Sequence, residues 1–283
     1  MHSWSSDSNR STGGVRARPL RSGVVTDADA DLTNVRNRAL ITGSSRGIGA
    51  DTAVLLAQRG YDVVINYRDE KKVRRADQVV EKVRAAGGES FAVRADLTDD
   101  ASVEEMFRTV VREWGGLDLL VLNASGGMEA GAAEDYALKL NRDAQLRVLE
   151  AGVPLMDPGS RVVFVTSHQA HFIATTPTMP EYEPVARSKR AGEDALRERI
   201  PALEERGIEF VVVSGDMIEG TATALILNRV NPGALDARRE AAGRLYNVQE
   251  FAAEVVAAAT EPVPANHTRF VGDVSGFTPI PGE

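Results

Sequence analysis

The 283-residue sequence contains no cysteine, only four histidines and no apolar run long enough to span a bilayer, which takes about 20 residues. Without cysteine there are no disulfides and no thiolate metal sites. The histidines are scattered, and the nearest pair, His168 and His171, is a poor metal motif, so we expect no metal. The start lacks the basic-then-apolar order of a secretion signal. We therefore expect a cytoplasmic protein with no membrane partner.

Positive charge is also in short supply, with 33 lysines and arginines against 41 acidic residues and a net charge of -8. Nucleic-acid binders need clustered positive surface, so this balance argues against a nucleic-acid partner. The hydrophobic content of 43% and the charged content of 26% are ordinary for a globular protein. The length fits one large α/β domain.

The first 33 residues differ in composition from the rest of the chain. They are rich in Ser, Gly, Arg and Asp without apolar periodicity, which predicts a flexible N-terminal arm (1–33) before a single domain (34–283). From residue 38 onward, short apolar runs alternate with segments of helical period, a pattern typical of a parallel sheet flanked by helices. We predict a doubly wound parallel sheet, the Rossmann fold, with seven strands at residues 39–42, 62–66, 91–94, 117–123, 161–166, 210–214 and 269–272.

A glycine-rich turn, Thr42-Gly43-Ser44-Ser45-Arg46-Gly47-Ile48-Gly49, joins the first predicted strand to a helix expected over 50–59. Glycines there permit a tight turn, and the free amides at the positive end of the helix attract a pyrophosphate. Asp96-Leu97 ends the third strand, and Asn123-Ala124-Ser125-Gly126-Gly127 ends the fourth. Together these elements resemble the short-chain dehydrogenase/reductase superfamily over about residues 38–220.

The resemblance implies a nicotinamide dinucleotide, with Asp96 on the adenine amine and Asn123 and Ala124 along the ribose channel. It predicts these cofactor-binding residues: Gly43, Ser45, Arg46, Gly47, Ile48, Gly49, Asn66, Tyr67, Arg68, Asp96, Leu97, Asn123, Ala124, Ser125, Gly126, Lys189, Met217 and Ile218.

The end of the second strand predicts which dinucleotide binds. A carboxylate there would repel a ribose 2'-phosphate, but the sequence reads Asn66-Tyr67-Arg68. Arg46 and Arg68 are able to fork onto a phosphate, which favours NADPH over NADH. The alternative is that both arginines are solvated surface charges.

Three reaction-centre positions of the superfamily are filled. Ser167 matches the serine that bonds the substrate carbonyl, Asn141 the proton-relay asparagine, and Lys189 the lysine that bonds the nicotinamide ribose. The fourth position, four residues before the lysine, holds Val185 instead of the tyrosine that donates the proton. Valine offers only methyl groups, so the departure affects proton transfer and leaves cofactor binding intact. Each match also has a purely structural alternative. Asn141 could cap or kink its helix, Ser167 could be a turn hydroxyl, and Lys189 could be an exposed side chain.

Three sources for the missing proton remain open. Pro184 is expected to begin the helix and leave Tyr182 in the preceding loop, away from Lys189. His168 follows the serine on a strand and is expected to face the opposite side. The third source is a phenol beside the substrate ketone. Forming a phenolate instead of a free alkoxide is easier by about 6 pKa units, or about 8 kcal/mol, which exceeds the roughly 3 to 5 kcal/mol that a general acid contributes.

A helical lid is predicted over residues 219–246, with helices at 221–230 and 234–245 and a turn at Asn231-Pro232-Gly233. This lid, the valine, and the run Glu-Tyr-Glu-Pro-Val-Ala-Arg-Ser-Lys resemble the atypical ketoreductases of aromatic polyketide antibiotic pathways. The resemblance implies an angucyclinone-type aromatic ketone as the small-molecule substrate. The alternatives are an ordinary short-chain alcohol dehydrogenase that uses Tyr182 and a non-catalytic NADPH-binding sensor.

The oligomeric state is open at this point. The charged residues that follow Lys189, namely Arg190, Glu193, Asp194 and Arg197, argue against a dimer through this helix face.

Overall fold

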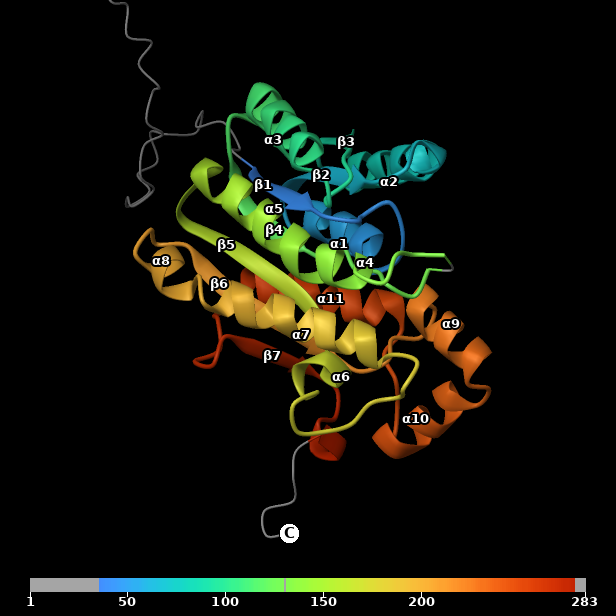
Figure 1. Ribbon diagram of the computed structural model, residues 1–283. Helices are drawn as coiled ribbons and strands as arrows, with labels where there is room; N and C mark the ends of the chain where they lie inside the picture. The colour runs from blue at the N-terminus through green and yellow to red at the C-terminus, as the bar shows by residue number, and fades with distance from the viewer. Residues whose placement is uncertain (1–35, 130, 278–283) are drawn as a thin grey trace, which may run out of the picture. The chain divides into compact units, whose positions relative to one another are not determined.

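The computed structural model describes residues 36–129 and 131–277, so the predicted N-terminal arm lies outside the described residues. A seven-stranded parallel sheet in the order β3-β2-β1-β4-β5-β6-β7 forms the centre (Figure 1). Its strands are β1 (Asn37–Ile41), β2 (Tyr61–Tyr67), β3 (Ser90–Arg94), β4 (Leu117–Leu122), β5 (Met156–Ser167), β6 (Glu209–Gly215) and β7 (Thr268–Val271). The doubly wound Rossmann fold predicted from the sequence is confirmed.

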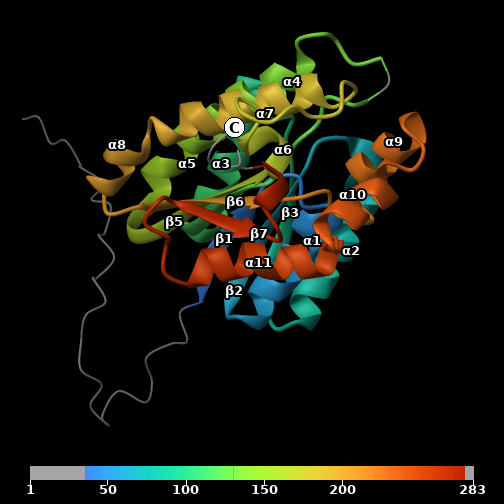
Figure 2. The same ribbon diagram turned by 90° about the horizontal axis from the view of Figure 1, so that it is seen from below.

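Helices cover both faces of the sheet, as Figures 1 and 2 show from two directions. One face carries α1 (Gly47–Gln58), α2 (Val73–Ala85) and α11 (Val248–Thr260). The other carries α3 (Asp100–Trp114), α5 (Ala144–Gly152), α7 (Glu183–Arg197) and α8 (Ile200–Glu204). The strands are nearly continuous apolar runs because both of their faces are buried.

Shorter elements complete the described chain, most of them near the carboxyl ends of the strands. They are η1 (Glu70–Lys72), α4 (Tyr136–Leu138), η2 (Lys139–Asp143), η3 (Val153–Leu155), α6 (His168–His171), α9 (Ala222–Val230), α10 (Ala234–Ala242) and η4 (Ser275–Phe277). The helices α9 and α10 stand where the sequence predicts the two helices of a lid, and we call residues 219–246 the lid segment. At its base, Glu219 N donates to Tyr246 O at 2.8 Å, and Glu219 pairs with Asn247 in an isolated bridge.

The chain reverses direction across the sheet at β1. This strand pairs with β2 on one side and with β4 on the other, so the connections after β1 and β4 run to opposite sides. Such a switch point leaves a crevice at the carboxyl ends of the strands, where open α/β sheets bind ligands.

Glu193 corrects one expectation about the helix after Lys189. Its side chain is fully buried, and its Oε1 accepts from His171 Nδ1 at 2.8 Å and from Arg197 Nε at 2.9 Å. Burial alone would raise the pKa of Glu193, but His171 and Arg197 lower it below the ordinary value. Glu193 therefore belongs to an internal ion-pair network, and it does not contribute charge to an outer helix face.

In the described part of the chain, no helix is both long and apolar enough to cross a membrane.

The helix α7 approaches the π-helical turn η2 very closely at Gly192. A Cβ placed on Gly192 would lie 1.9 Å from the backbone oxygen of Asn141. No side-chain rotation relieves a clash between a Cβ and a backbone oxygen, so one of the two helices would have to move.

We expect Gly192→Ala to lower the free energy of unfolding by about 3 kcal/mol, the upper part of the range for overpacking. In an ordinary helix the same change stabilises, because alanine is the better helix former by about 1 kcal/mol. The neighbouring Ala191→Gly, which should cost only about 1 kcal/mol, is the matched control. Urea unfolding of the three proteins gives the comparison, and a Gly192→Ala variant as stable as the parent would contradict the close approach.

Candidate active site

Two adjoining hollows lie at the carboxyl ends of the strands. We call them the outer groove, which runs past the glycine-rich turn, and the inner pocket, which is enclosed by α7 and the lid segment. They are continuous, because both are lined by Ile48, Asn123, Ser125, Thr221 and Thr223. A long ligand lying in the groove is therefore able to place one end in the pocket.

The outer groove collects most of the predicted cofactor-binding residues. Those that line it are Gly43, Ser45, Arg46, Gly47, Ile48, Gly49, Asn66, Tyr67, Arg68, Leu97, Asn123, Ala124 and Ser125. Asp96 and Gly126 lie outside this lining. Asp96 Oδ1 instead accepts from the backbone nitrogen of Thr98 at 2.9 Å and from its hydroxyl at 2.7 Å.

The N-terminus of α1 faces the groove without a cap. Arg46, in extended conformation, precedes the helix; none of the described side chains caps it, and its first turn carries no acidic residue. The first amides of a helix need an acceptor, and the helix dipole favours a negative one. This end of α1 therefore fits a pyrophosphate.

Side-chain hydrogen bonds hold the glycine-rich turn in place. Asn66 Oδ1 accepts from Gly43 N at 3.0 Å, and Thr42 Oγ1 accepts from Asn123 N at 2.9 Å. A Cβ on Gly49 would lie 2.6 Å from Asn123 Nδ2, so only glycine permits this approach of α1 to the end of β4. The amide of Asn66 thus supports the turn.

Positive charge gathers where β2 ends. Arg46, Arg68 and Lys72 all line this part of the groove. Burial, and then the nearby Arg68 and Arg46, lower the pKa of Lys72 below its ordinary value. An Arg68 Nη1 hydrogen bond to the Tyr136 hydroxyl anchors that guanidinium. Three cations along one stretch of the groove attract an anion.

Sequence reasoning missed Lys72 and Tyr136. Neither belongs to the glycine-rich motif or to the motifs that end the strands. Lys72 reaches the groove because η1 follows β2 directly, and Tyr136 reaches it on α4. The sequence gives no clear signal for either residue, since Asp69 and Glu70 balance the charges of Lys71 and Lys72.

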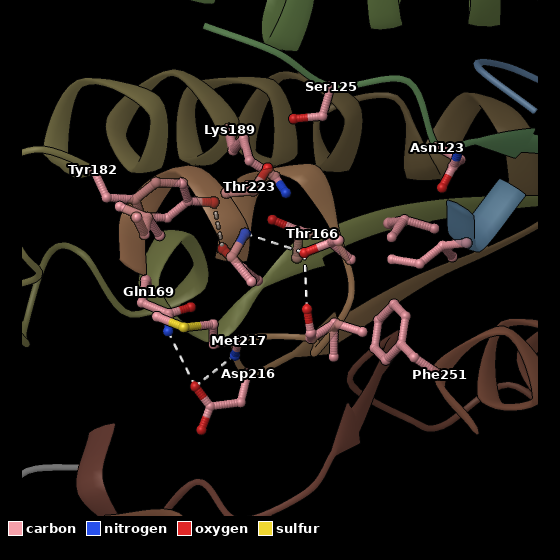
Figure 3. Close-up of a pocket in the computed structure, with 17 residues that line it drawn as sticks. Asn123, Ser125, Thr166, Gln169, Tyr182, Lys189, Asp216, Met217, Thr223 and Phe251 are labelled. Atoms are coloured by element: carbon pink, nitrogen blue, oxygen red, sulfur yellow. Dashed lines mark hydrogen bonds between the residues drawn. The ribbon is translucent and has the colours of Figure 1, made fainter. Parts of the chain in front are cut away.

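The inner pocket brings together Ser167 from the end of β5, Lys189 from α7, and Met217 and Ile218 after β6 (Figure 3). Tyr182 joins them, with its phenol oxygen 3.3 Å from Ser167 Oγ. Ser167 also begins α6, where its Oγ accepts from Ala170 N at 3.3 Å. A serine hydroxyl, a phenol and an ammonium group therefore face one enclosed space.

The position of Tyr182 corrects the expectation that it lies away from Lys189. The helix does begin at Glu183 with Pro184 in its first turn, as predicted. Tyr182, however, already has helical backbone angles, and its carbonyl accepts the first bond of the helix, from Ala186 N at 2.9 Å. Residues seven apart lie on one face of a helix. The side chains of Tyr182 and Lys189 accordingly share the inner pocket.

Val185 lies behind this pocket and outside its lining. It is buried, with 4% of its surface exposed, and it packs against Gly127, where an added Cβ would lie 3.1 Å from Val185 Cγ2. It forms part of an apolar cluster with Tyr182, Met217 and Leu227. Val185 therefore contributes to the apolar packing around Tyr182.

Asn141 also lies behind the pocket, in η2. Its Nδ2 donates to Gly126 O and to Ser188 Oγ, both at 2.9 Å, and its Oδ1 accepts from Gly126 N at 3.3 Å. Single π turns inside helices are frequent at functional sites. Asn141 thus links the end of β4 to the residue next to Lys189, and it does not itself line the pocket.

His168 faces away from the inner pocket, as expected for the residue after Ser167. Its Nδ1 lies 2.9 Å from Ser214 Oγ and its Nε2 lies 3.1 Å from Val271 O. A carbonyl only accepts, so Nε2 carries the proton and Nδ1 accepts from the serine. Burial lowers the pKa of His168 from its ordinary 6.5 to about 4. A buried neutral ring is not a proton donor to this pocket.

The lid segment closes the pocket on the side opposite α7. Ala224 and Leu227 of α9 face inward and are buried, while Leu225 is largely exposed beside the outer groove. Arg238 of α10 pairs with the buried Asp216, its Nη2 2.8 Å from Asp216 Oδ2. One ion pair therefore ties the lid segment to the residue that follows β6.

The crevice, the glycine-rich turn and the serine and lysine in one pocket are the arrangement of a nicotinamide-dependent oxidoreductase. Residues 43–263 match the family model described as enoyl-(acyl carrier protein) reductase. The chain belongs to the short-chain dehydrogenase/reductase superfamily, and its class is that of the NAD(P)-dependent reductases.

Two curated relatives show the range of that class. Hydroxynaphthalene reductase arp2 of Aspergillus fumigatus is 37% identical over 165 residues, covering 56% of this chain and 58% of that protein. This chain thus matches little more than half the length of that relative. The 1-cyclohexenylcarbonyl-CoA reductase of Streptomyces collinus is 32% identical over 227 residues, covering 77% of this chain and 78% of the relative.

Solved structures agree with this placement. A short-chain dehydrogenase from Burkholderia cenocepacia in complex with NADP has a TM-score of 0.69 and 28% identity, covering 83% of this chain and 96% of its own. The reductase LugOII catalyses keto-reduction at C1 during lugdunomycin biosynthesis. Its structure has a TM-score of 0.64 and 28% identity, covering 80% of this chain and 91% of its own.

The environment of His168 predicts a pH-dependent stability. The unfolded chain binds a proton near pH 6.5 and the folded chain only near pH 4, so the free energy of unfolding rises with pH between these values. The difference of about 2.5 units corresponds to about 3 kcal/mol lost between pH 7 and pH 4. His168→Gln retains a donor for Val271 and should remove this part of the dependence. Denaturant unfolding from pH 4 to 7 tests it, and identical slopes for both proteins would contradict a depressed pKa.

Proposed function

We propose that this protein uses NADPH to reduce a ketone on a polycyclic aromatic polyketide to the secondary alcohol. The observation that carries the proposal is the inner pocket, in which Ser167, Tyr182 and Lys189 meet at the inner end of the groove. Bound NADPH would supply a hydride to the carbonyl carbon. The chain's own residues must therefore hold the dinucleotide, orient the carbonyl oxygen and provide for its proton.

The outer groove supports NADPH over NADH. Arg46, Arg68 and Lys72 surround the place where β2 ends, and Asn66 stands where a carboxylate would oppose a 2'-phosphate. The uncapped start of α1 fits the pyrophosphate. We propose that Met217 and Ile218, which line the pocket, contact the nicotinamide, and that Lys189 bonds the nicotinamide ribose.

The aromatic polyketide substrate rests on the resemblance of the sequence to atypical ketoreductases of aromatic polyketide pathways, such as the simocyclinone 7-ketoreductase, an angucyclinone ketoreductase. Two relatives point to the same substrate class: one is named for hydroxynaphthalenes, and the other reduces a ketone in lugdunomycin biosynthesis. The pocket wall adds physical support, because Met217 lines it together with Leu227 and Phe251. Methionine is polarizable and flexible and suits contact with aromatic rings.

For the proton, the proposal is that a substrate hydroxyl beside the ketone assists its transfer. A phenol hydrogen-bonded to the carbonyl turns the product anion into a phenolate, and the gain of about 8 kcal/mol exceeds what a general acid contributes. Ser167 Oγ and the Tyr182 phenol then orient the carbonyl oxygen. Tyr182 as the acid itself is the second candidate, and the distance of 3.3 Å between its oxygen and Ser167 Oγ favours it.

The first test separates these two proton sources. The probes are 8-hydroxy-1-tetralone and its methyl ether, each with wild type and Tyr182→Phe. If the substrate hydroxyl assists, methylation lowers kcat/KM by at least about 100-fold, and Tyr182→Phe lowers it by no more than about tenfold. The reverse pattern would establish Tyr182 as the acid. Deuteride from labelled cofactor should appear on the carbinol carbon, and a protein that binds NADPH but reduces neither ketone would contradict ketone reduction itself.

The second test concerns the dinucleotide. A hydrogen bond to a charged partner is worth about 1.5 to 3 kcal/mol, so we expect Lys72→Met to raise the Kd for NADPH by about 10- to 100-fold. The Kd for NADH, which lacks the 2'-phosphate, should change by less than about threefold. Fluorescence titration measures both, with Lys71→Met as the matched control. Equal weakening of both dinucleotides would contradict a 2'-phosphate contact.

A further inference from the structure

The nitrogen and the oxygen of the Gln169 side-chain amide have different surroundings. It lies on α6, two residues after Ser167, and forms part of the inner pocket wall. Its Nε2 donates to Asp216 Oδ1 at 3.0 Å, whereas no residue in the described part of the chain donates to its Oε1. Figure 3 shows the amide nitrogen pointing to Asp216 and the oxygen pointing away from it, toward the pocket.

The orientation of this amide is fixed by Asp216. That carboxylate is buried and accepts from Met217 N at 2.7 Å and from Arg238 Nε at 2.8 and 2.9 Å. A carboxylate in an ion pair accepts hydrogen bonds and donates none. Turning the amide over would place Gln169 Oε1 against the Asp216 oxygens and lose one hydrogen bond. Gln169 is therefore held as an acceptor toward the pocket.

The pocket wall makes this acceptor consequential. Met217, Ile218, Ala224, Leu227 and Phe251 supply apolar surface, and the hydroxyls of Thr221 and Thr223 can donate as well as accept. An acceptor that loses water to an apolar ligand costs free energy unless the ligand donates to it. A ketone oxygen cannot satisfy it, since that oxygen also only accepts.

We infer that Gln169 is a specificity-determining residue, whose Oε1 accepts a hydrogen bond from a hydroxyl group of the substrate remote from the reacting carbonyl. The inference rests on the proposed ketone reduction and adds a requirement to it. Donors at Ser167 and Tyr182 bind the carbonyl oxygen, and the acceptor at Gln169 binds a hydroxyl. A hydroxyl hydrogen-bonded to the ketone itself is already engaged, so the group recognised here is a second one. The pocket thus selects hydroxylated aromatic ketones and fixes which way round they bind.

The probes are 8-hydroxy-1-tetralone, whose hydroxyl is already bonded to the ketone, and its three derivatives that carry a second hydroxyl at carbon 5, 6 or 7. Wild type should reduce at least one dihydroxy isomer with a kcat/KM about five- to tenfold above that of 8-hydroxy-1-tetralone, the factor for one neutral hydrogen bond. In Gln169→Met and Gln169→Leu this ratio should fall to about one. Because the readout is a ratio, a loss common to all four ketones does not affect it.

The matched control is Arg239→Met, which removes an exposed ion pair of the lid segment with Glu219 and leaves the pair of Arg238 with Asp216, and with it the orientation of Gln169, in place. Its ratio should stay within about twofold of wild type, even where KM values rise. NADPH titration of each variant checks that the fold is intact. Wild type that reduces 8-hydroxy-1-tetralone without preferring any dihydroxy isomer overturns the inference and leaves the proposed function standing, as does a ratio unchanged in both Gln169 variants. Wild type that reduces none of the four ketones overturns the proposed function, and the inference with it.

Discussion

The side chain of Thr42 bridges the ends of β1 and β4, and both hollows of the active site depend on that bridge. Its Oγ1 accepts from Asn123 N at 2.9 Å and from Ala124 N at 3.0 Å. At this point the segments that follow β1 and β4 separate toward opposite sides of the sheet. Asn123 Nδ2 donates back to Thr42 O at 2.9 Å. Backbone pairing between β1 and β4 ends at Ile41 and Val121. Beyond this pair the bonds of Thr42 and Asn123 take the place of strand-to-strand hydrogen bonds, so the backbone polar groups at the crevice keep partners. The groove and the pocket open from this point.

The fold was predictable because its signal is repeated along the whole chain. Seven apolar runs, each buried on two faces, alternate with helical segments, and the glycine-rich turn sits where the first run ends. The residues of the groove followed from the same motifs, since each motif lies next to a strand end. Asp96 lies outside the groove lining because its carboxylate caps the turn at Thr98, a local hydrogen bond that the motif alone does not show.

The inner pocket was less predictable, since its contents depend on how one loop meets one helix. Pro184 correctly marked the start of α7, but the helical angles of Tyr182, one residue before that start, decide which way its side chain points. Lys72, Gln169 and Arg238 reach the site through tertiary packing that leaves no local pattern. Glu193 looked like a surface charge, yet its partners His171 and Arg197 make it an internal one.

The bridge between Glu219 and Asn247 gives the lid segment an independence that the rest of the site lacks. The two ends of the lid segment are hydrogen-bonded to each other. The sheet is therefore joined to the same two end residues whatever chain lies between them. Loop-closure entropy grows only slowly with length, so insertions or exchanges here cost the sheet little. Exchange of this segment therefore leaves the sheet and the glycine-rich turn in place, while it changes the lid residues that line both the pocket and the groove.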